Sequence, residues 1–239
     1  MTLSRLTATI IILALTLVAA IVLRDQMRRH PERLPWTPLS LSMPIGPFTG
    51  SKLAMLADDP ARCRQLLGEA GVAFTPLPPV SGKQCGYDDG MTLLPGGTLA
   101  TRWQPGRLGV ACPMAAALVI WEREVVRPAA LRHFGKPVQS IEHFGSFSCR
   151  RIAGGGNWSE HAAANALDIA GFRLAGGKRI RVLSDWQGKS APAAFLHEVR
   201  DGACGVFATV LSPDYNAAHA DHLHFDEAAR GKSGGQYCR

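Results

Sequence analysis

The sequence predicts an α+β domain, with a mainly antiparallel sheet flanked by helices, that follows an N-terminal transmembrane helix. The first observation is an uncharged run of 18 residues near the start of the chain, Leu6 to Leu23. The second is a mixture of short helical and short extended patterns over the rest of the chain. The third is a pair of strand-like segments joined through Gly176-Gly177, a connection typical of adjacent antiparallel strands.

The uncharged run is long enough to cross a membrane as a helix. At roughly 1.5 Å per residue it would span about 27 Å, close to the thickness of a bilayer core. A cleaved signal peptide needs a small-x-small pattern near its end, and Ala19-Ala20-Ile21 lacks it. We therefore expect residues 1–24 to form a transmembrane signal anchor, or a signal that stays uncleaved.

The charges around this run and the cysteines favour opposite orientations. One arginine precedes the run and several follow it: Arg5 before, and Arg24, Arg28, Arg29 and Arg33 after. The positive-inside rule, taken alone, would place the bulk of the chain in the cytoplasm. Six dispersed cysteines without a CxxC pair are instead typical of three disulfides in an oxidising compartment. We give the cysteines more weight and expect a single-pass inner-membrane protein whose domain faces the periplasm.

The cysteines also suggest one specific disulfide. They are spread through the folded part of the chain: Cys63, Cys85, Cys112, Cys149, Cys204 and Cys238. We expect Cys204 to pair with Cys238, because that bond would tie down the C-terminus. The sequence leaves the pairing of the other four open.

The chain of 239 residues carries a formal net charge of +7. A basic surface suits an anionic partner such as nucleic acid, anionic lipid or an acidic cell-wall polymer, but it is also compatible with an ordinary soluble surface. No zinc-finger, RNP or helix-turn-helix signature is present, so we expect no nucleic-acid partner.

A proline-rich stretch separates the apolar run from the folded domain. Residues 25–51 contain Pro31, Pro35, Pro38, Pro44 and Pro47. Because proline cannot donate a backbone hydrogen bond, this stretch is predicted to be an extended linker. The domain is expected to cover residues 52–239, beginning near Lys52.

Helix and strand patterns follow in order along the domain. Two helices end or begin at clear signals: Gly71 ends the first, and a proline opens the second, the best-defined helix of the chain. The predicted helices are Ala61–Ala70, Pro113–Val126 and Pro192–Arg200, with a loop over Pro76–Gly86. The predicted strands are Val138–Phe144, Phe147–Arg151, Ala166–Phe172, Arg179–Leu183, Val206–Leu211 and His222–Phe225.

Two short segments supply the parts of a mononuclear zinc site. The first is Ser159-Glu160-His161, followed seven residues after the histidine by Asp168. The second is the octapeptide His219 to Asp226, with three histidines and two aspartates. Two histidines and one carboxylate are a common ligand set of catalytic zinc, with an acid/base group beside them.

The spacing of His161 and Asp168 constrains the local fold. On a continuous helix the two side chains would share a face but lie about 10 Å apart along the axis. Ligand atoms roughly 2 Å from one zinc ion lie only about 3 to 4 Å from each other. The chain is therefore expected to bend, with His161 on a loop or helix end and Asp168 on a strand.

Strand periodicity divides the octapeptide. On a strand, His222, His224 and Asp226 share one face, and Asp226 can orient a ligand histidine from outside the coordination sphere. Asp221 points the other way unless the chain bends before His222. His219 is expected beside the site or on the surface rather than among the ligands.

The two segments closely resemble the bacterial extensin-like C-terminal family. The resemblance extends from about Cys63 to Cys238 and rests on Cys149-Arg150, on Ser159 to Phe172 and on the octapeptide. That family is similar to zinc D-Ala-D-Ala carboxypeptidases and peptidoglycan endopeptidases, which share S-x-H-x6-D followed by H-x-H. The resemblance implies the D-Ala-D-Ala-peptidase/hedgehog-like zinc fold.

The resemblance also implies roles for single residues. His161, Asp168 and His224 match the ligands of Zn2+. His222 and Asp221 compete for the catalytic acid/base role.

Substrate contacts are implied for two more residues. Ser159 matches a serine that contacts substrate, and Arg150 resembles an arginine that grips a peptide carboxylate.

These features predict a zinc metallopeptidase, either a carboxypeptidase or an endopeptidase, with peptidoglycan as its partner. It would cleave peptide bonds in stem peptides or cross-links while anchored in the inner membrane through Leu6–Leu23. The main alternative is a non-catalytic zinc-containing module that binds the cell wall. A zinc hydrolase with another substrate is a further alternative. A structural zinc protein is the least favoured, because the cysteine-rich coordination of such sites is absent from the motifs.

Overall fold

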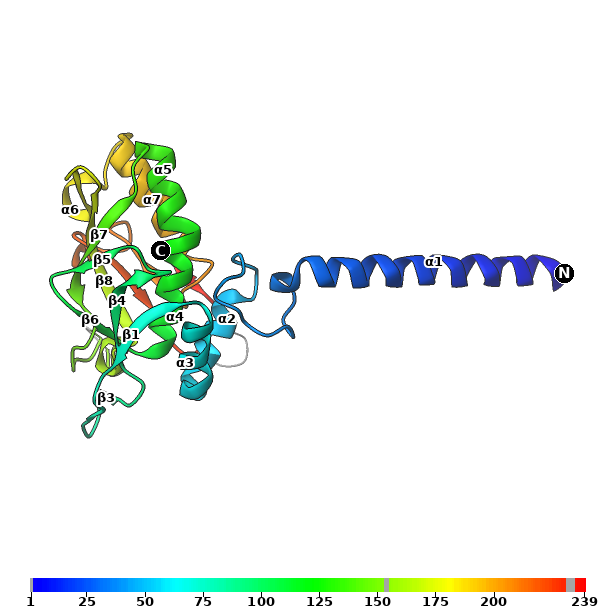
Figure 1. The fold of residues 1–239 in the computed structure, drawn as a ribbon, viewed down its shortest axis with the longest axis horizontal. Coiled ribbons are helices and arrows are strands. Elements are labelled where there is room, and N and C mark those ends of the chain that lie inside the picture. The colour runs from blue at the N-terminus through cyan, green and yellow to red at the C-terminus, as the bar shows by residue number, and fades with distance from the viewer. Residues whose placement is uncertain (1, 153–154, 231–234) are drawn as a thin grey trace.

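The structure is a computed structural model that describes residues 2–152, 155–230 and 235–239. It consists of a long N-terminal helix that projects from a folded domain (Figure 1). The helix, α1, covers Thr2–Arg29 and continues six residues beyond the predicted apolar run. In the described part of the chain, it is the one helix long and apolar enough to cross a membrane, over Arg5–Arg29.

Most of the segment expected to be a linker packs on the domain. After the short 3-10 helix η1 (Pro31–Arg33), Leu41 is 1% exposed and belongs to the hydrophobic core. Lys52 lies in helix α2 (Thr49–Ala54), and its Nζ donates to the Leu34 carbonyl at 2.7 Å. A proline-rich sequence indicates an extended chain, but it does not indicate whether that chain packs against a neighbour. We call residues 30–46 the strap.

A small antiparallel sheet and helix α3 open the domain. Helix α3 (Pro60–Glu69) confirms the first predicted helix, and Asp59 caps it by accepting from Arg62 N at 3.0 Å. The sheet has the order β1-β4-β6. Its strands are β1 (Val72–Pro76), β4 (Met91–Gly97) and β6 (Leu108–Val110). A separate hairpin consists of β2 (Val80–Ser81) and β3 (Gly86–Tyr87), and the 3-10 helix η2 (Met55–Asp58) precedes α3.

The main sheet has the strand order β12-β10-β11-β8-β7-β5, with β9 paired to β8. All its neighbouring strands are antiparallel except β5–β7 and β10–β12. The predicted mixed fold with a mainly antiparallel sheet is therefore confirmed. The strands are β5 (Arg102–Gln104), β7 (Val138–Gly145), β8 (Ala166–Leu174), β9 (Arg179–Arg181), β10 (Thr209–Leu211), β11 (Leu223–Asp226) and β12 (Tyr237–Cys238).

Helices cover one face of the main sheet. Trp121, at the end of the fully buried helix α4, packs its ring against Phe172 of β8 and Phe225 of β11, at centroid distances of 6.1 and 5.2 Å. The helix predicted to end at Val126 continues through a π-helical turn to Phe134, where Gly135 ends it in a left-handed conformation. The helices are α4 (Cys112–Trp121), the π-turn η3 (Glu122–Val126), α5 (Arg127–Phe134), α6 (Val182–Asp185) and α7 (Ala191–Ala203).

Three predicted strands are wrong in whole or in part, and one of them, expected over Val206–Leu211, begins only at Thr209. Phe147–Arg151 is not a strand: Cys149 is bonded to Cys85, and Arg151 forms an isolated bridge with Trp158. The strand predicted over Arg179–Leu183 ends at Arg181, because the chain turns into α6. In each place a few apolar residues resemble a strand, but a disulfide, a following helix or the turn after α7 holds the backbone in another conformation.

Three disulfides use all six cysteines: Cys63–Cys112, Cys85–Cys149 and Cys204–Cys238. The predicted number of disulfides and the predicted pair Cys204–Cys238 are both confirmed. Cys63–Cys112 joins α3 to α4, and Cys204–Cys238 joins the end of α7 to β12. Cys85–Cys149 fixes the chain just before Arg150, whose guanidinium lies 3.7 Å from Asp168 Oδ2.

Candidate functional site

His161 lies on a short 3-10 helix, η4 (Glu160–Ala163), and not on a continuous helix toward Asp168. The Ser159 side chain caps η4 by accepting from His161 N at 3.3 Å. Ala164 then adopts φ +54°, a left-handed conformation uncommon for alanine, and β8 begins two residues later. The predicted bend between a helix end and a strand is therefore confirmed.

Asp168 and His224 lie directly opposite each other on neighbouring antiparallel strands, β8 and β11. Along these strands Leu167 and Phe225 point into the core, so the residues that alternate with them point to the other face. His224 and Asp226 share that polar face, as predicted from the period of two.

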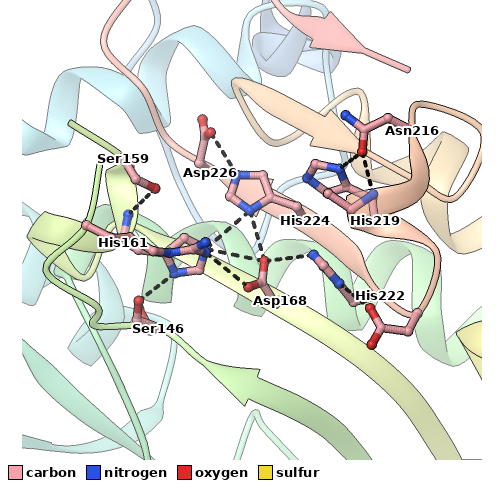
Figure 2. A network of polar contacts seen from close by, with 12 residues as sticks. Ser146, Ser159, His161, Asp168, Asn216, His219, His222, His224 and Asp226 are labelled. Atoms are coloured by element: carbon pink, nitrogen blue, oxygen red, sulfur yellow. Dashed lines mark hydrogen bonds and ion pairs between the residues drawn. The ribbon is translucent and has the colours of Figure 1, made fainter. Parts of the chain in front are cut away.

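The three predicted ligands bring their donor atoms to one point (Figure 2). His224 Nδ1 lies 2.9 Å from Asp168 Oδ1, and His161 Nε2 lies 3.3 Å from each of these two atoms. Three ligand atoms placed about 2.0 to 2.2 Å from a tetrahedral ion are separated by roughly the same distances. All three residues are buried.

The remaining nitrogen of each histidine is held by an oxygen. His161 Nδ1 donates to the Ser146 carbonyl at 2.6 Å, and His224 Nε2 donates to Asp226 Oδ2 at 3.1 Å. When both rings are neutral, each therefore turns an unprotonated nitrogen toward the Asp168 carboxylate. Three acceptors that face one another repel unless a positive charge lies between them, so the arrangement fits a metal cation.

The pKa shifts of His224 and Asp168 follow from the hydrogen bonds within this cluster. Burial lowers the pKa of His224, but hydrogen bonds to Asp168 and Asp226 outweigh it and raise the pKa to about 9. Burial raises the pKa of Asp168, but hydrogen bonds from His161 and His224 hold that pKa well below its usual range. The site thus stabilises a positive charge, which a proton or a metal ion can carry.

His222 lies at the open side of the cluster, one residue before β11 begins. Its Nε2 is 3.5 Å from Asp168 Oδ1, and its Nδ1 donates to Asp221 Oδ1 at 2.8 Å. Asp221 lies in a turn, with 47% of its side chain exposed, so its orientation is not that of a strand residue. The two candidates for the acid/base role therefore form one hydrogen-bonded pair.

Arg150 and His219 lie at the edge of the site. The Arg150 guanidinium is 3.7 Å from Asp168 Oδ2 and 55% of its side chain is exposed, so it can reach a ligand. The His219 ring lies 5.1 Å from that of His222 and donates from Nδ1 to Asn216 Oδ1 at 2.7 Å. Burial, with His222 nearby, lowers the pKa of His219 to about 4, so it is neutral at pH 7.

Several residues of the site are not predictable from the sequence. The Ser146 carbonyl belongs to the backbone and carries no sequence signal. Asn165 links two elements behind the ligands, since its Nδ2 donates to Glu160 Oε2 at 2.9 Å and to the Glu227 carbonyl at 3.0 Å. Glu227 is 1% exposed, and its carboxyl oxygens find no hydrogen-bond partner among the described residues.

The motifs and the disulfides fall within one family match. No curated protein and no solved structure matches the chain. The family model described as extensin-like protein C-terminus matches residues 61–239, which include all six cysteines and every residue of the cluster. Because this match covers most of the chain, the protein belongs to the extensin-like C-terminal family.

Proposed function

We propose that this protein is a zinc-dependent peptidase that cleaves peptide bonds in peptidoglycan stem peptides or cross-links. The observation that carries the proposal is the convergence of His161, Asp168 and His224, with the second nitrogen of each histidine held by an oxygen. Imidazole and carboxylate ligands suit zinc, and three protein ligands leave one position open for water or substrate.

Zinc, when bound, would act as a Lewis acid and lower the pKa of a water molecule toward about 7. The proton of that water is assigned to Nε2 of His222, because Asp221 holds the other ring nitrogen and leaves Nε2 unprotonated. Asp221 then stabilises the imidazolium that forms. His222 also lies at the open side of the cluster, where it can return the proton to the leaving amine.

The proposed substrate is a peptide that carries a carboxylate. Arg150 lies beside Asp168, exposed enough to pair with such a group through two parallel hydrogen bonds. Ser159 caps the helix that carries His161, and the resemblance to S-x-H-x6-D assigns it to substrate contact. The shared S-x-H-x6-D and H-x-H patterns support the zinc fold of the D-Ala-D-Ala peptidases for this domain.

The three disulfides and the apolar helix α1 support a location in the periplasm, with α1 in the inner membrane. Peptidoglycan, which carries free peptide carboxylates, is the polymer available there. The basic net charge of +7 is compatible with this acidic partner.

Digestion of purified sacculi with the zinc-loaded full chain tests the proposal. Mass spectrometry of the released fragments would identify the cleaved bond, and His222→Ala should retain zinc but release little product. A wild-type protein that holds one zinc ion and releases no fragments would instead favour the binding module.

The role of Arg150 has a matched control in its neighbour. Arg150→Ala should raise KM for stem peptides with little change in kcat. Arg151→Ala should leave KM unchanged, because Arg151 stacks on Trp158, with 4.5 Å between the guanidinium carbon and the ring centroid.

A further inference from the structure

The strap, residues 30–46, is held firmly against the domain. Lys52 is 8% exposed, and its ammonium group donates to the Leu34 carbonyl at 2.7 Å and to the Thr37 hydroxyl at 3.0 Å. Leaving a buried ammonium group without acceptors costs free energy, so this contact resists release of the strap. Farther along the strap, the Arg123 guanidinium binds the carbonyls of Leu41 and Met43.

The strap also closes on itself through apolar and backbone contacts. Leu41 is 1% exposed and packs in the domain core. A Cβ atom at Gly46 would overlap the carbonyl of Glu32, so the two ends of the strap touch. These contacts make residues 30–46 a fixed part of the domain rather than a tether.

No flexible segment separates the strap from the membrane-spanning length of helix α1. Its 28 residues, Thr2–Arg29, correspond to about 42 Å at roughly 1.5 Å per residue, which matches the 40 to 45 Å of a bilayer with its headgroups. His30 N still donates to Gln26 O at 2.9 Å, so the helical hydrogen bonds continue to the first residue of the strap. The strap therefore begins where the headgroups end.

The polar cluster lies on the opposite side of the domain from the strap. Arg123, which binds the strap, belongs to the helical layer, and in that layer Trp121 packs on Phe225 in the core face of the sheet. His224 and Asp168 point to the other face of the same strands. In Figure 1, α1 leaves the domain on the side of α2 and α4, and β7 and β8 lie beyond them.

We propose that the strap fixes the domain with its helical layer toward the bilayer and its site facing away, so that the site acts on the polymer outside the membrane. Stem peptides on a lipid carrier in the same bilayer would be poor substrates. A helical layer about 10 to 12 Å thick and the sheet lie between that bilayer and the site. This inference rests on the proposed function and on α1 as the membrane span.

The orientation can be measured without any activity. The full chain, reconstituted in vesicles with an acceptor fluorophore on the lipid headgroups, is labelled at one introduced thiol: Trp36→Cys on the strap or Phe144→Cys beside His222. Both residues are well exposed, at 67% and 61%. Energy transfer should be much stronger from position 36 than from position 144. Equal transfer from the two positions would overturn the proposal.

A flexible Gly-Ser insertion between Arg29 and His30 supplies the matched control, because it frees the domain from α1 and leaves the strap contacts intact. The insertion should reduce the difference in energy transfer between the two labels. It should also raise the rate at which a lipid-carried stem peptide in the same vesicles is cleaved, by about tenfold or more. The freed domain can then reach a substrate in the same membrane that anchors α1.

A soluble stem peptide separates the two proposals. The native chain and the insertion variant should cleave it at the same rate. If the native chain cleaves lipid-carried peptide as fast as the variant does, the orientation proposal is wrong. If neither protein cleaves the soluble peptide, the proposed function fails, and the energy transfer still decides the orientation.

Discussion

Strands β8 and β11 carry opposite chemistry on their two faces. On one face Leu167 and Phe225 are fully buried in the hydrophobic core against α4. On the other face Asp168, His224 and Asp226 place two carboxylates and an imidazole within hydrogen-bond distance. A shift of one residue in the register would exchange the two sets.

Stability and chemistry are therefore separable in this domain. Apolar burial on the core face holds the strands together and so fixes the distance between Asp168 and His224. The polar residues depend on that distance to meet, but they do not pack in the hydrophobic core. Substitutions on the two faces should therefore change different measured quantities.

The largest expected effect is the loss of metal from the polar face. His161→Ala or His224→Ala removes one of the three proposed ligands, so zinc affinity should fall by more than about 100-fold. That is the largest loss typical when only a residue that hydrogen-bonds a ligand is changed. The domain should stay folded, because the core face is intact. Metal analysis and circular dichroism of the purified variants measure both effects. His133→Ala is the control: it changes a histidine that pairs with Glu198 and not with the cluster, so this variant should keep its zinc.

On the core face, Phe225→Ala should reduce the free energy of unfolding by about 3 to 5 kcal/mol, since it leaves a cavity beside Trp121 and Phe207. Urea denaturation of the metal-free protein measures this. The exposed Phe144 is the control, and its replacement by alanine should cost less than about 0.5 kcal/mol. If the folded fraction of Phe225→Ala no longer binds zinc, the two faces are not separable.

Asp226→Asn tests the polar face one step from the ligands. The carboxylate fixes His224 through Nε2, so its neutral replacement should weaken zinc binding by about 10- to 100-fold. Competition with a chelator of known affinity measures the change. Asp221→Asn is the matched control, because Asp221 contacts His222 and no ligand, and its zinc affinity should stay within a few-fold of wild type. Equal losses in the two variants would contradict the assignment.

The smallest expected effect is a pH slope from Glu227. Burial, together with the nearby Asp226 and Glu160, raises the pKa of Glu227 well above 4.5. The folded state then holds this proton more tightly than the unfolded chain does. The stabilisation is therefore fully present below the unfolded pKa and is lost as the pH rises toward the folded pKa.

Glu227→Gln removes this titration. Relative to the variant, the wild-type free energy of unfolding should fall with rising pH, by at most about 1.4 kcal/mol per pH unit. Urea denaturation of both proteins from about pH 5 to about pH 8 measures the slope. A difference that stays constant over this range would show that the pKa of Glu227 is not raised in the folded state.

Much of the site was predictable because its residues follow simple geometry. The spacing of His161 and Asp168 excludes a continuous helix, and the period of two in His224 and Asp226 places both on one face. The pair Cys204–Cys238 was predictable because it ties the C-terminus to the domain. For His161, Asp168, His224 and Asp226, local spacing alone limits the possible arrangements.

The rest depends on contacts between distant segments. The strands Met91–Gly97 and Arg102–Gln104 are interrupted by or close to glycine and proline, so their patterns are weak. Asp221 could not be placed because its direction depends on a turn stabilised by His222. Glu227 follows a strand, and the alternation along that strand does not indicate which residues cover its end. The packing of the strap depends on Lys52 and on Arg123, which lies 80 and 82 residues along the chain from the carbonyls that it binds.

The proposed function requires that His161, Asp168 and His224 hold one zinc ion. Zinc-edge X-ray absorption on the purified full chain tests it most directly. We expect two imidazole nitrogens and one carboxylate oxygen at about 2.0 to 2.2 Å, with one imidazole lost in His224→Ala. A spectrum with sulfur ligands at about 2.3 Å, or one unchanged in His224→Ala, would contradict the claim.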